Sequence, residues 1–462
     1  MTLHLMQMVS ERQDDKFNLH SQYLNAQFVN VLKMIGFDCH FVRGKGQYLY
    51  DKDQNKYLDL LSGFGVFAVG RNHPTVCDAL TQVIQGDLPN LVQMDVSVLS
   101  GVLAEKLLPY LPGMEKVLFC NSGTEAVEAA IKFSRAATGK NKIISCSHAF
   151  HGLTCGALSL NGDDIFKQGF GSLLPDCVSI PFNDLGALEA ALRGGDVAAF
   201  VVEPIQGKGV HLPDDDYLPD AARLCKKYGA LFVADEIQTG IGRTGKFLAL
   251  EHWGVEPDMI LLAKALSGGF VPVGAVATKK WIFEKVFNRM DRAVVHGSTF
   301  GKNDLAMAAG IAVLSVLQEE KLVERAATYG SRILDDLKSL VPRYEFLKEV
   351  RGKGMMIGVE FGPPKSFVLK ASWDMLEKAN RGLFCQMVTI PLFRRHHIIT
   401  QVAGHGMYVV KLLPPLVVSD ADCDWIRDSF ESAIADCHKI PGSVWDLARS
   451  LAGAAVKIGM GR

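Results

Sequence analysis

The architecture of this chain is clearest in two segments, Ala230-Leu-Phe-Val-Ala-Asp-Glu-Ile-Gln238 and Met259-Ile-Leu-Leu-Ala-Lys-Ala-Leu-Ser-Gly-Gly269. Each begins with a short, wholly apolar run, which is typical of a strand buried on both faces of a parallel sheet. Each run ends at one charged residue, Asp235 in the first and Lys264 in the second. Because ligands of open parallel sheets bind beyond the carboxyl ends of the strands, both residues are predicted to face a binding site.

Similar apolar runs alternate with helical stretches over the middle of the chain. This alternation predicts an α/β fold with a large, doubly wound, mainly parallel sheet. The predicted strands are Lys116–Cys120, Lys142–Cys146, Ala198–Glu203, Ala230–Asp235, Met259–Ala263 and Val273–Thr278, and the predicted helices include Glu125–Ala137, Tyr217–Tyr228 and Asn303–Leu317.

The two ends of the chain have a different pattern of apolar and polar residues. Residues 24–35 have helical apolar spacing that ends at Gly36, and residues 47–60 have the pattern of a β-hairpin. After about residue 325, long helices mix with strand-like runs at 355–361 and 408–412, which indicates a smaller α+β domain. The predicted organisation is an N-terminal segment (1–75) that contributes to the small domain, a large cofactor-binding domain (76–324), a C-terminal small domain (325–440) and a tail (441–462).

Composition excludes several classes of function. The net charge of -1 provides no field that would attract nucleic acid. The ten cysteines form no C-x-x-C pair and no Cys/His cluster, so neither a metal site nor a disulfide framework is predicted. The N-terminus lacks the pattern of a secretion signal, and no apolar run is long enough to span a membrane. We therefore expect a soluble, cytoplasmic protein.

The residues at the strand ends predict specific chemistry. A lysine that follows a buried strand is partly desolvated, which lowers its pKa and makes its amine a better nucleophile. The alternative for Lys264 is a surface lysine, but the following Ser-Gly-Gly lets the backbone approach a ligand. Asp235 needs a cationic partner if it is buried. Its alternatives are a metal ligand, for which companion residues are lacking, and a helix N-cap.

A third segment, Asn121-Ser-Gly-Thr, follows a predicted strand and opens a predicted helix. Backbone N–H groups at a helix N-terminus bind phosphate, so a phosphate site is predicted here. Ordinary N-capping is the alternative for these residues.

Together, the motifs resemble those of the class III aminotransferases of pyridoxal 5′-phosphate (PLP) fold type I, the group that includes ornithine, 4-aminobutyrate, acetylornithine and putrescine aminotransferases. The resemblance extends from about residue 35 to 440. It rests on Tyr57-Leu-Asp59, Asn121-Ser-Gly-Thr-Glu-Ala-Val-Glu128, Phe150-His-Gly152, Val202-Glu-Pro-Ile-Gln-Gly207, Asp235-Glu-Ile-Gln-Thr-Gly240, Lys264-Ala-Leu-Ser-Gly-Gly269, His296-Gly-Ser-Thr299 and Pro414-Pro-Leu416.

The resemblance implies a role for each matching residue. Lys264 would hold PLP as a Schiff base and move protons, and Asp235 would pair with the pyridine nitrogen. Gln238 would bind the phenolic oxygen and Phe150 would stack on the ring. The remaining implied cofactor contacts are Ser122, Gly123 and Thr124 at the phosphate, Glu203 near the cofactor, and Thr299 reaching the phosphate from a second subunit. A homodimer with shared active sites is implied, and structural roles are favoured for His151 and Arg243.

Three positions depart from the family pattern. Lys411 stands where these enzymes commonly have an arginine that binds a substrate carboxylate, and Lys208 stands where they have a glutamate that neutralises it. Lysine lacks the planar fork of arginine, so the usual arginine–glutamate pair is absent. Phe64 occupies a position that is tyrosine in ornithine aminotransferase. These three residues are candidate substrate contacts, although Lys411 is equally well explained as a lysine at a strand end.

We therefore expect an aminotransferase that transfers an amino group between an amine or amino acid and an oxo acid or aldehyde, acting on a terminal group of an extended or lipid-like substrate. An ornithine- or 4-aminobutyrate-type enzyme and an aminomutase on the same fold stay open as alternatives. The tail carries an apolar stripe that could lie on a membrane surface or dock onto the protein itself. Its residues are Trp445, Leu447, Ala448, Leu451, Ala452, Ala455 and Val456, with Arg449, Lys457 and Arg462 on the polar side.

Overall fold

The computed structural model describes residues 3–92, 95–379, 381–404, 406–439, 442 and 445–446. Its largest element is a seven-stranded sheet in which β10 runs antiparallel to both neighbours and the strands from β9 to β6 run parallel. The strands in sheet order are β4 (Lys116–Cys120), β10 (Gly274–Thr278), β9 (Met259–Leu262), β8 (Leu231–Asp235), β7 (Val197–Val202), β5 (Lys142–Cys146) and β6 (Cys177–Ile180).

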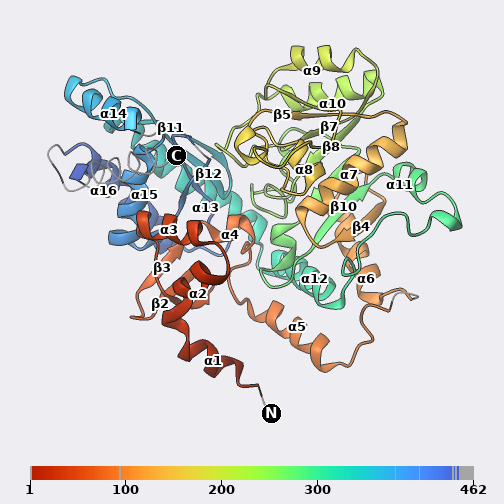
Figure 1. Cartoon of the computed structure of the whole chain (residues 1–462), viewed down its shortest axis with the longest axis horizontal. Helices are drawn as coiled ribbons and strands as arrows, with labels where there is room; N and C mark the ends of the chain where they lie inside the picture. Colours follow the sequence, from red (N-terminus) through yellow and green to blue (C-terminus); the bar gives the residue numbers. More distant parts are fainter. Residues whose placement is uncertain are drawn as a thin grey trace.

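Helices cover both faces of this sheet, on the right of Figure 1. Val201 and Val233 pack toward α7 and α11, whereas Phe200 and Phe232 point the opposite way, toward α9 and α10. The sheet is therefore buried on both faces, which explains the uninterrupted apolar runs of its strands. The helices of this part are α5 (Pro74–Gln85), α6 (Val98–Leu107), α7 (Gly123–Thr138), α8 (Cys155–Ser159), α9 (Leu185–Leu192), α10 (Tyr217–Tyr228), α11 (Lys280–Val286) and α12 (Asp304–Glu319).

The two ends of the chain come together on the left of Figure 1. One four-stranded sheet has the order β1 (Phe41–Lys45), β2 (Tyr48–Asp51), β3 (Lys56–Asp59) and β13 (Ile398–Ile399), so strands near both ends share it. The other has the order β11 (Leu347–Lys353), β12 (Met356–Phe361), β15 (Val409–Leu412) and β14 (Gln401–Val402). The accompanying helices are α1 (Leu5–Glu11), α2 (Lys16–Tyr23), α3 (Ala26–Ile35), α4 (Ser62–Gly65), α13 (Leu322–Lys338), α14 (Phe367–Ala379), α15 (Phe384–His396) and α16 (Asp420–Cys437).

Short 3-10 helices connect these elements. The one that matters for the site is η5, because it begins at Lys264 and packs against α12. The 3-10 helices of the described residues are η1 (Gln13–Asp15), η2 (Leu108–Tyr110), η3 (Asp164–Phe166), η4 (Ala249–His252), η5 (Lys264–Ser267), η6 (Met290–Arg292) and η7 (Val341–Arg343).

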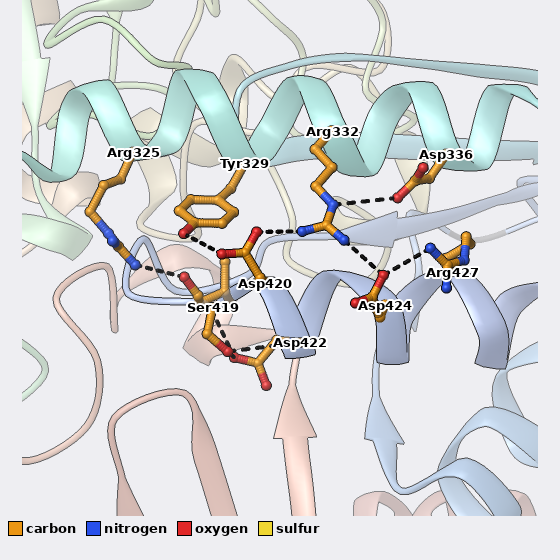
Figure 2. A network of polar contacts seen from close by, with 10 residues as sticks. Arg325, Tyr329, Arg332, Asp336, Ser419, Asp420, Asp422, Asp424 and Arg427 are labelled. Atoms are coloured by element: carbon orange, nitrogen blue, oxygen red, sulfur yellow. Dashed lines mark hydrogen bonds and ion pairs between the residues drawn. The ribbon is translucent and has the colours of Figure 1, made fainter.

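A polar network joins α13 to the start of α16 (Figure 2). Arg332 on α13 binds Asp420 at 2.5 Å and Asp424 at 2.7 Å, and Arg325 donates to the carbonyl of Val418 at 2.8 Å. The network lies beside the N-terminus of α16, where negative side chains stabilise a helix. It ties α13, which follows the large-sheet region, to the last long helix of the described chain.

The structure confirms the predicted α/β class with a large, mainly parallel sheet and a second α+β region. The six predicted strands of the large sheet are all present: two have the predicted bounds, three are one residue shorter and one is shifted by one residue. The predicted helix before Gly36 is α3, whose Gly36 cap has φ 72°. The prediction missed β6, β1 and β11, which are short or partly exposed. The domain boundaries at residues 75, 324 and 440 stay predictions.

The predicted tail falls mostly outside the described residues. Trp445 is the exception among the apolar stripe, and it is buried, with its Nε1 donating to the carbonyl of Cys437 at 3.0 Å and its ring near Phe346. Trp445 thus packs on the protein itself, and membrane contact by the rest of the stripe stays a prediction. Among the described residues, no helix combines the length and apolar character needed to cross a membrane.

Candidate active site

Three neighbouring strands of the large sheet bring charged residues to one edge. Val202 of β7 lies beside Ala234 of β8, so Glu203 and Asp235 follow at adjacent strand ends. Asp235 in turn lies beside Leu261 of β9, the strand that leads to Lys264. The parallel register therefore places a buried amine next to two buried carboxylates.

Asp235 is held in place by two hydrogen bonds. Its Oδ2 lies 2.7 Å from Nδ1 of His151, and its Oδ1 accepts from the backbone N–H of Ile237 at 3.1 Å. Burial alone would lower the pKa of His151, but the hydrogen bond and charge of Asp235, together with Glu203, raise this pKa overall. The Nε2 atom of His151 has no partner among the described residues. Asp235 therefore keeps a compensated negative charge in an otherwise buried environment.

Lys264 is placed on a strained turn. Its φ is 41°, in the left-handed region that side chains rarely adopt, and its carbonyl accepts from Oγ of Ser267 at 2.8 Å. Such strain persists where surrounding contacts over-determine the backbone, often at functional sites. Burial lowers the pKa of Lys264, although Asp235 and Glu203 oppose this change. The amine is thus closer to its neutral, nucleophilic form than a lysine in water.

Glu203 holds two loops in place, one at Phe150 and one at Gly207. Its Oε1 accepts from the backbone N–H of Phe150 at 2.9 Å, and its Oε2 accepts from that of Gly207 at 2.7 Å. Burial raises the pKa of Glu203, and Asp235 adds to the increase. Glu203 therefore positions the segment that carries Phe150 and His151, which follows β5.

The N-terminus of α7 forms another side of the site. Ser122 caps the helix, since its Oγ accepts from the N–H of Glu125 at 3.3 Å. The hydroxyl of Thr124 lies 2.7 Å from that of Thr154. A Cβ on Gly152 would come within 2.4 Å of Thr124 Oγ1, so the loop approaches the helix end only because residue 152 is glycine. The N–H groups of Gly123 and Thr124 have no partner within the helix, which is the arrangement that binds anions at helix N-termini.

These elements enclose a cavity of about 540 Å³. Lys264 and His151 reach it from the sheet edge, and the α7 N-terminus reaches it from another side. Most of the other lining groups are apolar. The residues that line it are Val66, Asn121, Ser122, Gly123, Thr124, Phe150, His151, Gly152, Leu153, Ile237, Ala263, Lys264, Ser267, Gly269, Phe270, Val271, Pro272 and Val273.

Gln238 and Lys411 lie together at the border of the site. Nε2 of Gln238 donates to the carbonyl of Phe64 at 3.0 Å, and its Oε1 accepts from Nζ of Lys411 at 3.3 Å. Nζ of Lys411 also donates to the carbonyl of Gly207 at 2.7 Å. Burial lowers the pKa of Lys411 to about 7, and the ammonium of Lys264 acts in the same direction. The Phe64 ring is 53% exposed.

Lys208 is bound by partners of its own. Its Nζ donates to Asp163 at 2.6 Å and lies 4.0 Å from the ring centroid of Phe166 and 5.5 Å from that of Phe150. A lysine that is neutralised by a carboxylate and covered by aromatic rings has little charge left for a substrate. Lys208 therefore supports the segment that carries Phe150.

The sequence profile of the family described as Aminotransferase class-III matches residues 32–434. The chain belongs to the class-III aminotransferases. The predicted family is thus confirmed, and membership of this aminotransferase family implies PLP as the cofactor.

Curated class-III relatives cover nearly the whole chain. The acetylornithine aminotransferase of Bacillus cereus is 39% identical over 386 residues, which are 83% of this chain and 92% of that protein. An ornithine aminotransferase of Bacillus cereus is 38% identical over 406 residues, 85% of this chain and 93% of that protein. Aminotransferase PigE of Serratia sp. is 33% identical over 450 residues, 90% of this chain but 53% of PigE, so the chain spans about half the length of PigE.

Solved class-III structures have the same fold. The ornithine aminotransferase of Toxoplasma gondii has a TM-score of 0.81 and 30% identity, covering 94% of this chain and 99% of that chain. An amine transaminase from an uncultivated Pseudomonas species, solved in its PLP-bound form, has a TM-score of 0.73 and 29% identity, covering 86% of this chain and 94% of that chain.

His151 differs from the sequence expectation in this class-III site, whereas Arg243 has the expected structural role. His151 was expected to be structural in a turn, whereas the structure places it in direct contact with Asp235. Arg243 is fully buried and donates to the carbonyls of Met355 and Pro414, and burial lowers its pKa to about 9. Only the Phe-His-Gly motif hinted at His151, because the contact joins residues far apart in the sequence.

Thr299 lies apart from the cavity that Lys264 reaches. It is exposed and lines a separate hollow of about 360 Å³, together with residues 88–92 and 95–99 and with Ser298, Lys302 and Asp304. Within one chain, therefore, Thr299 does not line the cavity that contains Lys264, although its neighbour Ser298 accepts from Nδ2 of Asn121 at 2.6 Å.

Proposed function

We propose that this chain is a PLP-dependent aminotransferase that acts on a terminal amine or aldehyde of an extended, largely apolar substrate. The observation that carries the proposal is the convergence of Lys264, Asp235 and Glu203 at the ends of three adjacent strands beside one cavity. Membership of the class-III aminotransferases supports the reaction class.

The residues present fit PLP. Asp235, with its charge stabilised by His151, would face the pyridine nitrogen, and the N–H groups that open α7 would hold the phosphate. Gly152 and Gly123 let Thr124 and Ile237 pack closely around the start of α7, because a Cβ at either glycine would come within 3.0 Å of one of these residues. When bound, PLP supplies an aldehyde for condensation with amines and an electron-withdrawing ring. Phe150 would cover the ring, and Gln238 would donate to the phenolic oxygen.

The protein side of the chemistry rests mainly on Lys264. Burial lowers the pKa of its amine, which favours the neutral, nucleophilic form, and the same amine would carry a proton near the substrate carbon. Asp235 and Glu203 keep the site negative enough to hold cations. Asp235 and Glu203 are both buried, which strengthens these interactions.

The substrate proposal rests on the mouth of the cavity. Apolar side chains line it, and neither Lys208 nor Lys411 presents an unengaged charge to the cavity. An apolar chain gains free energy by leaving water for such a surface. The apolar lining residues are Val66, Leu153, Ile237, Phe270, Val271, Pro272 and Val273.

We also propose that the enzyme works as a homodimer in the cytoplasm. Support for the dimer comes from the separate location of Thr299, whose hollow is bordered by exposed Val96 and Val98. Exposed apolar side chains of this kind mark surfaces that bind partners. Thr299 would then complete the phosphate site of the second subunit.

Replacement of Lys264 tests the reaction class. In the Lys264→Ala variant we expect PLP to bind without covalent attachment and turnover to fall at least about 1,000-fold, because the nucleophile and proton carrier are lost. Mass spectrometry after borohydride reduction detects the attachment, and amine-to-oxo-acid assays measure turnover. The exposed Lys280→Ala is the control. Near-normal turnover by Lys264→Ala would rule out the assignment.

A substrate series tests the apolar mouth. With primary amines and aldehydes of increasing chain length, kcat/KM is expected to rise about threefold to fourfold for each buried methylene. Release of a free oxo product separates a transaminase from an aminomutase. Efficient turnover confined to ornithine or 4-aminobutyrate would contradict the proposed substrate class.

A further inference from the structure

Lys411 occupies a rigid position beside the site. It lies on β15, an inner strand, where it pairs with Gly358 of β12 and Gln401 of β14, and its carbonyl accepts from Thr400 Oγ1 at 2.7 Å. The residue is 4% exposed. Because its backbone is fixed in a sheet and its side chain is buried, its Nζ is held at the carbonyl of Gly207 and the amide of Gln238.

The amide of Gln238 has one acceptor end and one donor end, and neighbours determine which way it points. In its protonated form Lys411 is a donor only, so it attracts the oxygen of the amide. The carbonyl of Phe64 is an acceptor only, so it attracts the nitrogen. Both neighbours thus favour one orientation. One N–H of Gln238 is then left without an acceptor among the described residues.

The turn at Gly207 is shaped to permit this arrangement. A Cβ at residue 207 would lie 2.8 Å from Oε1 of Gln238 and 3.0 Å from Oε2 of Glu203. With glycine at this position, the backbone donates to Glu203 and accepts from Lys411. The ammonium is thus held between a fixed carbonyl and the amide that it orients, which leaves no unpaired charge toward the cavity.

We propose that Lys411 is a positioning residue for Gln238, holding the amide so that its remaining N–H points to an acceptor atom of the bound cofactor. This inference rests on the proposed PLP function. When Lys411 is protonated, its charge also polarises the amide, which makes that N–H a stronger donor. In this role Lys411 supports the cofactor through Gln238 and does not bind a carboxylate of the substrate.

A double-mutant cycle on PLP affinity tests the coupling. The apoproteins of wild type, Lys411→Met, Gln238→Ala and the double variant are titrated with PLP, and dissociation constants are measured by absorbance. We expect affinity to fall about 10-fold for Gln238→Ala and about 3- to 5-fold for Lys411→Met. The double variant should bind within about twofold of Gln238→Ala, because Lys411 acts only through Gln238.

Two further variants separate positioning from charge. Lys411→Arg keeps donors for Gly207 and Gln238 and should bind PLP nearly as wild type does. Lys208→Met removes a charge nearby without touching Gln238, so its effect should add to that of Gln238→Ala. If Lys411→Met does not fold, Lys411→Ala, in which water can take the place of Nζ, replaces it in the cycle.

The outcomes are distinct. Additive losses for Lys411→Met and Gln238→Ala would overturn the inference while leaving the proposed function intact. An unchanged PLP affinity with a raised KM for oxo acids in Lys411→Met would also overturn it, since Lys411 would then bind the substrate. Failure of the wild-type chain to bind PLP would overturn the proposed function and this inference together.

Discussion

Asp235 shows how single residues control this site. The carboxylate is buried, yet it lies between the ring of His151 and the N–H of Ile237, so its charge is compensated before any ligand arrives. An isolated charge in such a place would be expensive to bury. The buried charge of Lys411 is compensated in the same way, because its ammonium donates to two acceptors. Asp235, Glu203 and Lys411 are each preorganised by at least one backbone group.

The pH dependence of stability should reveal the His151–Asp235 contact. The raised pKa of His151 means that the folded apoprotein binds more protons than the unfolded chain. This contribution is fully present below pH ~6.5 and is lost as the pH rises through the folded-state pKa, with a slope of at most about 1.4 kcal/mol per pH unit.

His151→Asn keeps a donor near Asp235 but does not titrate, so it should lack this slope. Thermal unfolding of both apoproteins, followed by circular dichroism between about pH 5.5 and 8.5, measures the difference. Parallel stability profiles for wild type and variant would show that the contact does not depend on protonation of the ring.

At the scale of elements, α16 is anchored at its N-terminus. Asp422 is buried and accepts from the N–H and hydroxyl of Ser419, forming a capping box. It also accepts from Gln47 at 2.7 Å and from Tyr48 at 2.6 Å, residues at the start of β2. One carboxylate therefore joins the last long helix of the described chain to the N-terminal sheet. The network of Figure 2 continues this connection to α13.

Removal of this carboxylate should loosen the joint. Asp422→Ala leaves buried donors without an acceptor, so we expect a loss of about 3 kcal/mol in unfolding free energy. Asp428→Ala on the same helix removes an exposed ion pair with Arg427 and should cost less than about 0.5 kcal/mol. Urea unfolding of the two variants compares them. Equal losses would argue that Asp422 contributes only surface electrostatics.

At the scale of the whole molecule, the cavity of one chain contains Lys264 and the α7 N-terminus but not Thr299. A site shared between two subunits would explain this distribution. In a dimer with twofold symmetry, Thr299 of each subunit can lie beside the cavity of the other. Two inactive chains could then complement each other.

Subunit mixing tests the shared site. Lys264→Ala is expected to be inactive, and Thr299→Ala to need more PLP. After the two are mixed and allowed to exchange, half of the dimers pair the variants, and one of their two sites is intact. Activity at limiting PLP should therefore recover to about a quarter of the wild-type value. No recovery, with exchange verified by mass spectrometry, would contradict a site that spans two subunits.

The amino-acid pattern alone was sufficient to predict the large parallel sheet, its two-sided burial and the charged residues at its strand ends. The spacing and length of apolar runs in the sequence indicate local burial directly. A motif such as Asp235-Glu-Ile-Gln238 can be recognised at the end of an apolar run without knowledge of the rest of the fold. Short, partly exposed strands such as β6 escaped because they lack that pattern.

Which side chains meet was settled by tertiary packing. His151 reaches Asp235, and Lys411 reaches Gln238, across sequence separations that no local pattern encodes. The same holds for Lys208, a candidate substrate contact whose Nζ donates to Asp163. The physical reason is that partners of this kind depend on strand register and on the directions of loops, and these are fixed only when the sheets pack together.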